Sequence, residues 1–188
     1  LQTAALEILG CSMTESSCQE EAGVLLLLEE NREVGKEGYE ICQKGGQLLI
    51  ISGGEAGILY GVFHLTRMLQ CSSKELELPV KKTPDSPLRM LNHWDNMDGS
   101  IERGYSGESF FFQKNEVLVN DRTRAYARLA ASVGINGVVI NNVNVKDRAT
   151  WLIDKVFQKE LKEMSDIFAS YGIRLFLSLN FAAPMELG

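Results

Sequence analysis

Long apolar runs and clusters of positive charge are both missing from this sequence of 188 residues. The apolar stretch at residues 24–28 stops at Glu29 and Glu30, well short of the roughly 18 unbroken apolar residues of a membrane span. The net charge is −6, and no stretch rich in Lys and Arg and interleaved with aromatic residues provides the positive field that binds a phosphate backbone. We therefore expect neither a membrane nor nucleic acid as a partner.

Cysteine and histidine are also scarce, and their spacing is wrong for a metal site. The four cysteines all fall within the first 71 residues: Cys11, Cys18, Cys42 and Cys71. These positions match neither a zinc ribbon nor a dense disulfide scaffold. His64 and His93 stand alone, without the spacing of metal ligands. We expect no metal ion and no cofactor.

The hydrophobic fraction of 45% is enough for one good core or two small ones. Pro84 and Pro87, with polar residues around them, suit an exposed connector. We predict a small α/β domain at residues 1–85 and a second domain at residues 86–188. The sequence starts at Leu1 without a charged and then apolar leader, and we interpret it as a piece of a longer protein. Cytoplasmic, periplasmic and secreted locations all remain open.

The first region has the pattern of a sheet covered by a helix. Residues 3–10 suit a helix end, and residues 24–28, 39–42 and 47–51 suit strands. The helix at residues 55–69 carries an apolar stripe of Ile58, Val62, Leu65 and Leu69. The preceding SGGEAG segment favours a tight turn over a phosphate-binding loop, because Glu55 stands where an anion would bind. This pattern predicts a small α/β sandwich domain.

The second region alternates apolar strands with helices. Strands are expected at residues 88–91, 137–140 and 174–179, each followed by polar residues. One helix should start at Asp121 and end at Gly134, with Tyr126, Leu129, Ala130 and Val133 on one face. The next carries Phe157, Leu161, Met164 and Phe168 and ends at Gly172. Such alternation predicts parallel strands buried on both faces.

Two architectures fit parallel strands that alternate with helices, an open doubly wound sheet and a (β/α)₈ barrel. An open nucleotide-binding sheet calls for a glycine-rich first loop, whereas this strand runs into NHWDNMDGS. We favour the first three βα units of a truncated TIM barrel. Ligands of both architectures bind at the carboxyl ends of the strands.

The polar cluster at residues 92–107, NHWDNMDGSIERGYSG, suits a sugar site. The Trp94 indole offers an apolar platform, and amide, carboxylate and imidazole groups can bind hydroxyls. The alternative is a loop held by Asx turns, with Trp94 as a packing anchor. Arg103 could bind a substrate carboxylate or pair with a neighbouring acid. The nearby acids do not form a convincing catalytic pair, because barrel enzymes usually draw their catalytic acids from different strands.

Three segments resemble the α-glucuronidases of glycoside hydrolase family 67: NHWDNMDGSIERGYSGESFFF, YARLAASVGINGVVINNVNV and YGIRLFLSLNFAAP. The resemblance covers roughly residues 88–184. Before it, GYEI, LLIISG and EAGILYGVFHLTRML are similar to the small α/β domain that precedes the barrel in this family and, more distantly, in β-N-acetylhexosaminidases.

This resemblance implies removal of (4-O-methyl)-D-glucuronic acid, α-1,2-linked to the terminal xylose of xylo-oligosaccharides, with inversion and without a metal. It also implies that the longer protein forms a homodimer. The catalytic carboxylates of the family lie on later barrel strands, so we expect no catalytic residue in this chain. A noncatalytic carbohydrate-binding module and a hexosaminidase-like hydrolase are the alternatives.

The resemblance assigns substrate contacts to strand ends. Trp94 matches the tryptophan of the uronic-acid pocket, and Val143 matches a pocket wall. By position in the matching motifs we add the following substrate-binding candidates: Asn92, Asp95, Asn142 and Asn180. Arg103 remains a weaker candidate, because the basic residues with which this family binds the substrate carboxylate lie downstream.

Overall fold

The computed structural model describes residues 14–15, 22–30, 33–71, 76–141, 147–179, 185 and 187. The helix expected at residues 3–10 lies outside this set, as do Cys11 and Cys18. The chain separates into two compact units, Leu1–Pro87 and Leu88–Gly188. The division falls in the connector that contains Pro84 and Pro87.

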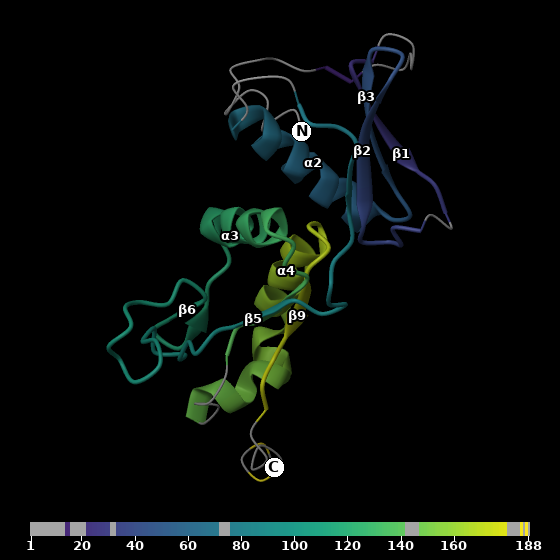
Figure 1. Cartoon of the computed structure of the whole chain (residues 1–188). Coiled ribbons are helices and arrows are strands. Elements are labelled where there is room, and N and C mark those ends of the chain that lie inside the picture. The colour runs from purple at the N-terminus through teal and green to yellow at the C-terminus, as the bar shows by residue number, and fades with distance from the viewer. Residues whose placement is uncertain are drawn as a thin grey trace. The chain divides into compact units, whose positions relative to one another are not determined.

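In the described part of the first unit, helix α2 lies on a four-stranded mixed sheet (Figure 1). Its elements are β1 (Val24–Leu28), β2 (Tyr39–Lys44), β3 (Gln47–Ser52), α2 (Glu55–Cys71) and β4 (Val80–Lys82). The strand order is β1-β3-β2-β4, with β1 parallel to β3 and the other pairs antiparallel. The α2 stripe packs on the sheet through Val62 and Leu65, which meet Ile41 and Ile50 in the core.

The connection from β3 to α2 is the tight turn that the sequence predicts. The Ser52 hydroxyl donates to the Gly38 carbonyl at 2.6 Å and accepts from the Gly54 amide at 3.2 Å. A Cβ atom at Gly57 would lie 2.0 Å from Ser52 Oγ and 2.3 Å from the Gly38 carbonyl oxygen. Gly57 therefore allows α2 to start against the sheet.

The second unit contains a three-stranded parallel sheet. Its strands β5 (Met90–Asn92), β8 (Gly137–Val139) and β9 (Arg174–Phe176) lie in the order β5-β8-β9. The helix α3 (Asp121–Ser132) joins β5 to β8. The 3₁₀ helices η1 (Asp147–Ile153) and η2 (Lys155–Phe157) precede α4 (Gln158–Ala169), which packs beside β9 (Figure 1). A short hairpin of β6 (Phe112–Gln113) and β7 (Glu116–Val117) lies between β5 and α3 in the chain.

Two sequence predictions for helix α3 need correction. The residue that caps α3 is Asn120, not Asp121, because the Asn120 side chain accepts from the Arg122 amide at 2.9 Å. The buried face of α3 is also rotated from the predicted one and consists of Thr123, Ala127, Ala130 and Ala131. Leu129 and Val133 are 64% and 69% exposed, since small side chains rather than large ones let this helix approach its neighbours closely.

The strands of the second unit are shorter than predicted, and β5 is not buried on both faces. Met90 and Asn92 are exposed, whereas Val138 in the central strand β8 is fully buried. The difference follows from the strand order, because β5 is an outer strand of the described sheet and β8 lies between its two neighbours. The stripe predicted for α4 is confirmed, with Phe157, Met164 and Phe168 buried.

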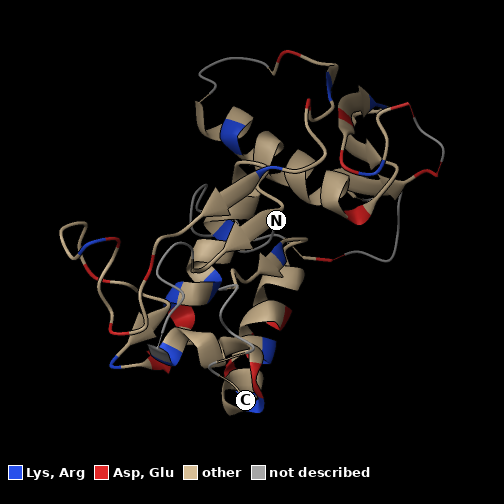
Figure 2. Ribbon diagram, turned by 90° about the horizontal axis from the view of Figure 1, so that it is seen from below, with Lys and Arg blue, Asp and Glu red and all other residues tan. Residues whose placement is uncertain are grey.

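Acidic and basic residues are interspersed along the ribbon of both units (Figure 2). Within the described ranges, no helix has both the length and the apolar character needed to cross a membrane. The same part of the chain contains no group of three or more His, Cys, Asp or Glu residues that could hold a metal ion.

Candidate functional site

The candidate site lies at the carboxyl ends of the parallel strands, where the polar motif begins. The His93 amide extends the pairing of β5 with β8 by donating to the Val139 carbonyl at 2.9 Å. Beyond β8, Asn141 is 3% exposed, and its side chain donates to the Ser178 carbonyl at 3.1 Å and accepts from the Ser178 amide at 3.0 Å. These contacts fix the end of β8 to the segment that follows β9.

Successive side chains of the segment after β5 differ sharply in exposure. The side chains of His93 and Asp95 are 23% and 3% exposed, whereas Trp94 is 41% exposed and Asn92 is also exposed. This alternation in exposure has the period of a strand, with Asn92 and Trp94 outward and His93 and Asp95 inward. The motif therefore presents an indole and an amide outward and keeps its imidazole and first carboxylate inside.

The inward pair belongs to a buried polar network. Asp95 accepts a hydrogen bond from Ser109 through Oδ2, and its Oδ1 lies 3.7 Å from His93 Nδ1. His93 Nε2 lies 2.5 Å from the Tyr126 hydroxyl of α3. Phe111 packs edge-on against the His93 ring, with 5.0 Å between ring centroids. The segment after β5, the segment that contains Ser109 and Phe111, and the helix α3 thus meet at the strand end.

Burial shifts the protonation equilibria of this network. It lowers the pKa of His93, although the neighbouring Asp95 acts in the opposite direction. It raises the pKa of Asp95 against the hydrogen bond from Ser109 and the proximity of His93. Burial, with the Asp95 carboxylate nearby, raises the pKa of Tyr126 to about 12. A neutral imidazole satisfies both contacts when Tyr126 donates to Nε2 and Nδ1–H faces Asp95.

The rest of the motif is a loop held by its own side chains. Asp98 accepts from the Ser100 amide at 2.8 Å and from its hydroxyl at 2.7 Å, and these bonds lower the pKa of Asp98. The Asn96 side chain donates to Ser100 Oγ and to the Glu102 carbonyl, both at 2.9 Å. Glu102 has a positive φ of 57° and accepts from the Tyr105 hydroxyl at 2.7 Å. Local bonds of the Asx type, the alternative interpretation of the cluster, are therefore present in this loop.

The structure separates the candidate residues into three groups. Trp94 and Asn92 are exposed at the strand end, and Arg103 is exposed in the loop. Asp95 is buried and bonded to Ser109. The other three candidates lie outside the described residues: Asn142, Val143 and Asn180.

Sequence reasoning missed Ser109 and Tyr126 as partners of the motif. Tyr126 matched the spacing of a helix core, so nothing in the periodicity distinguished its hydroxyl from an apolar ring edge. Ser109 stands directly before three phenylalanines, and a hydroxyl at the start of such an apolar run was the available signal.

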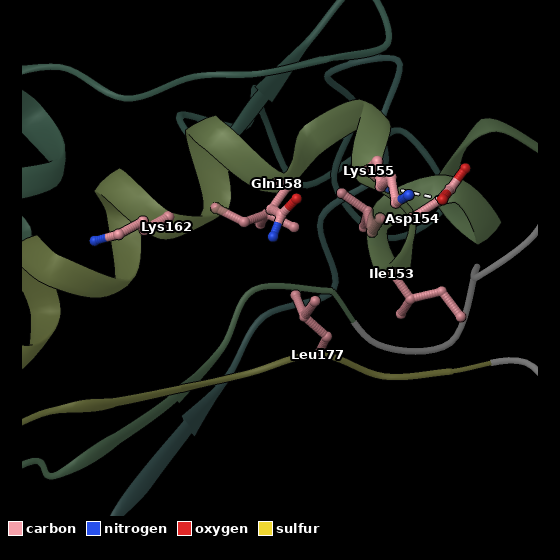
Figure 3. Close-up of a pocket in the computed structure, with 8 residues that line it drawn as sticks. Ile153, Asp154, Lys155, Gln158, Lys162 and Leu177 are labelled. Atoms are coloured by element: carbon pink, nitrogen blue, oxygen red, sulfur yellow. Dashed lines mark hydrogen bonds between the residues drawn. The ribbon is translucent and has the colours of Figure 1, made fainter.

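A pocket of about 670 Å³ lies elsewhere in the second unit, beside η2, α4 and the segment after β9 (Figure 3). Its lining mixes Ile153, Leu161 and Leu177 with Lys155 and Gln158. None of the residues of the motif lines it. Lys162 at its margin pairs with Asp166 at 2.5 Å. We assign the candidate site to the end of β5 rather than to this pocket, because the polar motif lies at the end of β5 and does not reach the pocket lining.

The solved structures that the chain resembles in fold include several glycoside hydrolases. One is a GH20 exo-β-N-acetylglucosaminidase from Vibrio harveyi, with a TM-score of 0.61 and 11% identity over 98% of this chain and 32% of that one. Another is a family GH115 4-O-methyl-α-glucuronidase with specificity for decorated arabinogalactans, with a TM-score of 0.52 and 14% identity over 79% of this chain and 20% of that one. At these identities the likeness concerns the fold alone, a mixed α/β fold found in glycoside hydrolases.

Sequence comparison narrows the class to one family. The glycosyl hydrolase family 67 middle domain matches residues 68–188, and the chain belongs to this family. A relative named probable alpha-glucuronidase A, from Aspergillus fumigatus, is 38% identical over 203 aligned positions, which cover the whole of this chain and 24% of the relative. The chain thus spans about a quarter of the length of that relative. The family match starts within α2, earlier than the resemblance read from the motifs alone.

Proposed function

We propose that this chain is the part of an α-glucuronidase that supplies one wall of its uronic-acid pocket. The substrate is an oligosaccharide in which (4-O-methyl)-D-glucuronic acid is α-1,2-linked to the terminal xylose of a xylo-oligosaccharide. Such oligosaccharides arise in the breakdown of xylan. Membership of family 67 and the name of the Aspergillus fumigatus relative support this assignment. No membrane or nucleic acid takes part, and the longer protein acts as a homodimer.

The fold that we propose for the second unit is the start of a TIM barrel. The order β5, α3, β8, α4, β9, with all three strands parallel, supports three βα units of such a barrel. We keep residues 1–85 as the preceding α/β domain and residues 86–188 as the barrel portion.

The reaction that we propose is inverting hydrolysis. One carboxylic acid protonates the leaving xylose oxygen while a carboxylate on the opposite face activates water. Asp95 is bonded to Ser109, and Asp98 and Glu102 are bonded within their loop. These acids are therefore already engaged, which supports the placement of both catalytic groups on later strands of the longer protein.

One observation carries the proposal: Trp94 is exposed at a strand end while the residues on either side of it are turned inward. An exposed indole beside amide groups suits the C–H face and the methyl group of the sugar. Asn92 shares the face of Trp94 and can bind a hydroxyl. In the same proposal Asn142, Val143 and Asn180 come from the neighbouring strand ends, and Arg103 has the weakest support.

The test is the release of glucuronic acid from aldouronic oligosaccharides by the full-length protein. Trp94→Ala should lower kcat/KM about 30-fold or more, because a buried tryptophan contact is worth roughly 2 kcal/mol or more. Trp151→Phe is the matched control, since it changes the second tryptophan of the chain, in η1. If Trp94→Ala and Trp151→Phe both kept the kcat/KM of the wild type, Trp94 would not be part of the pocket. Failure of the wild type to act on any aldouronate would reject the substrate.

The family match weighs against a hexosaminidase-like hydrolase. A separate carbohydrate-binding module is disfavoured by the outer strands β5 and β9, each of which has only one partner strand in the described part of the chain.

A further inference from the structure

The two residues beside Trp94 have side chains with fixed hydrogen-bond partners, whereas no hydrogen bond of the Trp94 ring is seen among the described residues. Among the described residues, the hydrogen bond recorded for Trp94 is made by its backbone, whose carbonyl accepts from the Glu102 amide at 2.7 Å. On either side, His93 and Asp95 have inward side chains with fixed partners. In extended backbone, holding residues on one face determines the direction of the residue between them.

Ser109, the hydrogen-bond partner of Asp95, is oriented by backbone amides. Ser109 Oγ accepts from the Phe111 and Phe112 amides, each at 3.1 Å. These two donors occupy the acceptor positions of the hydroxyl, so its own proton is left to donate to Asp95. The Ser109 amide in turn donates to the Gly99 carbonyl at 2.8 Å. Ser109 is thus fixed before the carboxylate meets it.

The partner on the His93 side comes from a helix. Tyr126 lies in α3, whose start is fixed by Asn120, and its ring packs edge-on against Phe111 and Phe168, with centroid distances of 5.6 and 6.1 Å. The Tyr126 hydroxyl therefore reaches His93 from a rigid support. An apolar ring at this position would fill the same space, so the hydroxyl serves a purpose other than packing.

We propose that Tyr126 and Ser109 are positioning residues that, through His93 and Asp95, set the direction in which Trp94 leaves the end of β5. The inference rests on the proposed function for its consequence in catalysis. If Trp94 contacts the sugar equally in the ground state and the transition state, a misdirected indole weakens substrate binding without slowing the chemical step.

The kinetic test uses the full-length protein with Tyr126→Phe and Ser109→Ala, each of which removes one hydroxyl. Tyr171→Phe and Ser170→Ala are the matched controls, since they remove the same groups near the end of α4. We expect KM for an aldouronic oligosaccharide to rise about fivefold in each network variant, as suits the loss of one hydrogen bond, with kcat unchanged. Ser109→Thr, which keeps a hydroxyl, should restore KM. A fall in kcat at constant KM would overturn the inference.

A second readout needs no substrate. The protein is labelled with 5-fluorotryptophan, and the Trp94 fluorine resonance is identified by its loss in Trp94→Phe. The resonance should move or broaden in Tyr126→Phe and in Ser109→Ala but not in the two controls. A resonance that stays in place in both network variants overturns the inference. A resonance that moves in a protein without activity on any aldouronate upholds the positioning and rejects the proposed function. If Tyr126→Phe does not fold, the inference is tested by comparing KM and the Trp94 resonance of Ser109→Ala with those of Ser109→Thr.

Discussion

At the scale of single residues, burial decides what each polar group of the motif can do. The sequence places His93, Trp94 and Asp95 side by side, and composition alone makes all three equal candidates for sugar contact. Packing separates them, because a buried carboxylate must be hydrogen-bonded and Asp95 obtains its bond from Ser109. The residue with the least polar side chain, Trp94, is the one left exposed for a ligand.

The two histidines predict how stability depends on pH. Burial lowers the pKa of His64, as do Arg67 and Lys82, and burial lowers the pKa of His93. An unfolded chain takes up these protons near pH 6.5, whereas the folded chain resists them. The free energy of unfolding is therefore not reduced by these two histidines above about pH 6.5. It decreases as the pH falls below that value, because the unfolded chain then binds protons that the folded chain does not. The raised pKa of Asp95 acts in the opposite direction, since the folded state binds that proton more tightly.

His64 is the cleaner residue for this measurement, because His93 is linked to Asp95. Denaturant unfolding of the full-length protein should show a midpoint that decreases between about pH 7.5 and about pH 5.5. In His64→Gln the decrease should be smaller. Identical pH dependence in the two proteins would show that His64 does not contribute to it.

At the scale of elements, close approach of a helix to a sheet depends on glycine. Gly57→Ala would place a methyl group 2.0 Å from Ser52 Oγ and 2.3 Å from a backbone oxygen that cannot move freely. Overpacking costs roughly 1–3 kcal/mol, and contacts as short as these lie at the upper end, above the gain in helix propensity of about 1 kcal/mol. Gly23→Ala is the control, because no described atom lies within 4 Å of the place that its new methyl group would take.

The measurement for this prediction is the free energy of unfolding of both variants in the full-length protein. Gly57→Ala should be destabilised and Gly23→Ala nearly unchanged. Equal stability of the two would mean that α2 can move away from β3 without loss.

Local pattern predicted the elements better than the contacts between them. The strands β1 and β3 and the helix α2 follow from apolar runs and periodicity, and their bounds agree with the sequence within two residues. The buried face of α3 does not follow from apolar periodicity, because alanine rather than leucine packs inward there. The exposure of Trp94 at a strand end suits the site that the motif suggested. The pairing of its supports with the motif could not be predicted from local pattern, since Ser109 and Tyr126 lie 14 and 33 residues from their partners.

At the scale of the whole molecule, the 188-residue chain should show no glucuronidase activity by itself. It spans 24% of the Aspergillus fumigatus relative, and its motif acids Asp95, Asp98 and Glu102 are held by internal hydrogen bonds. Inverting hydrolysis needs an acid and a base on opposite faces of the sugar with room for water between them. The pocket wall that we propose would contact the sugar through Trp94, but it would not protonate the leaving oxygen and activate water together.

The experiment compares the purified chain with the full-length protein on the same aldouronic oligosaccharide at equal molar concentration. Release of glucuronic acid should be confined to the full-length protein, and mixing in the isolated chain should not increase it. Turnover by the isolated chain that rises with its concentration and disappears in Trp94→Ala would contradict this prediction. It would place a complete acid and base among residues 1–188, and the buried Asp95 would then have to exchange its bond to Ser109 for a part in the reaction.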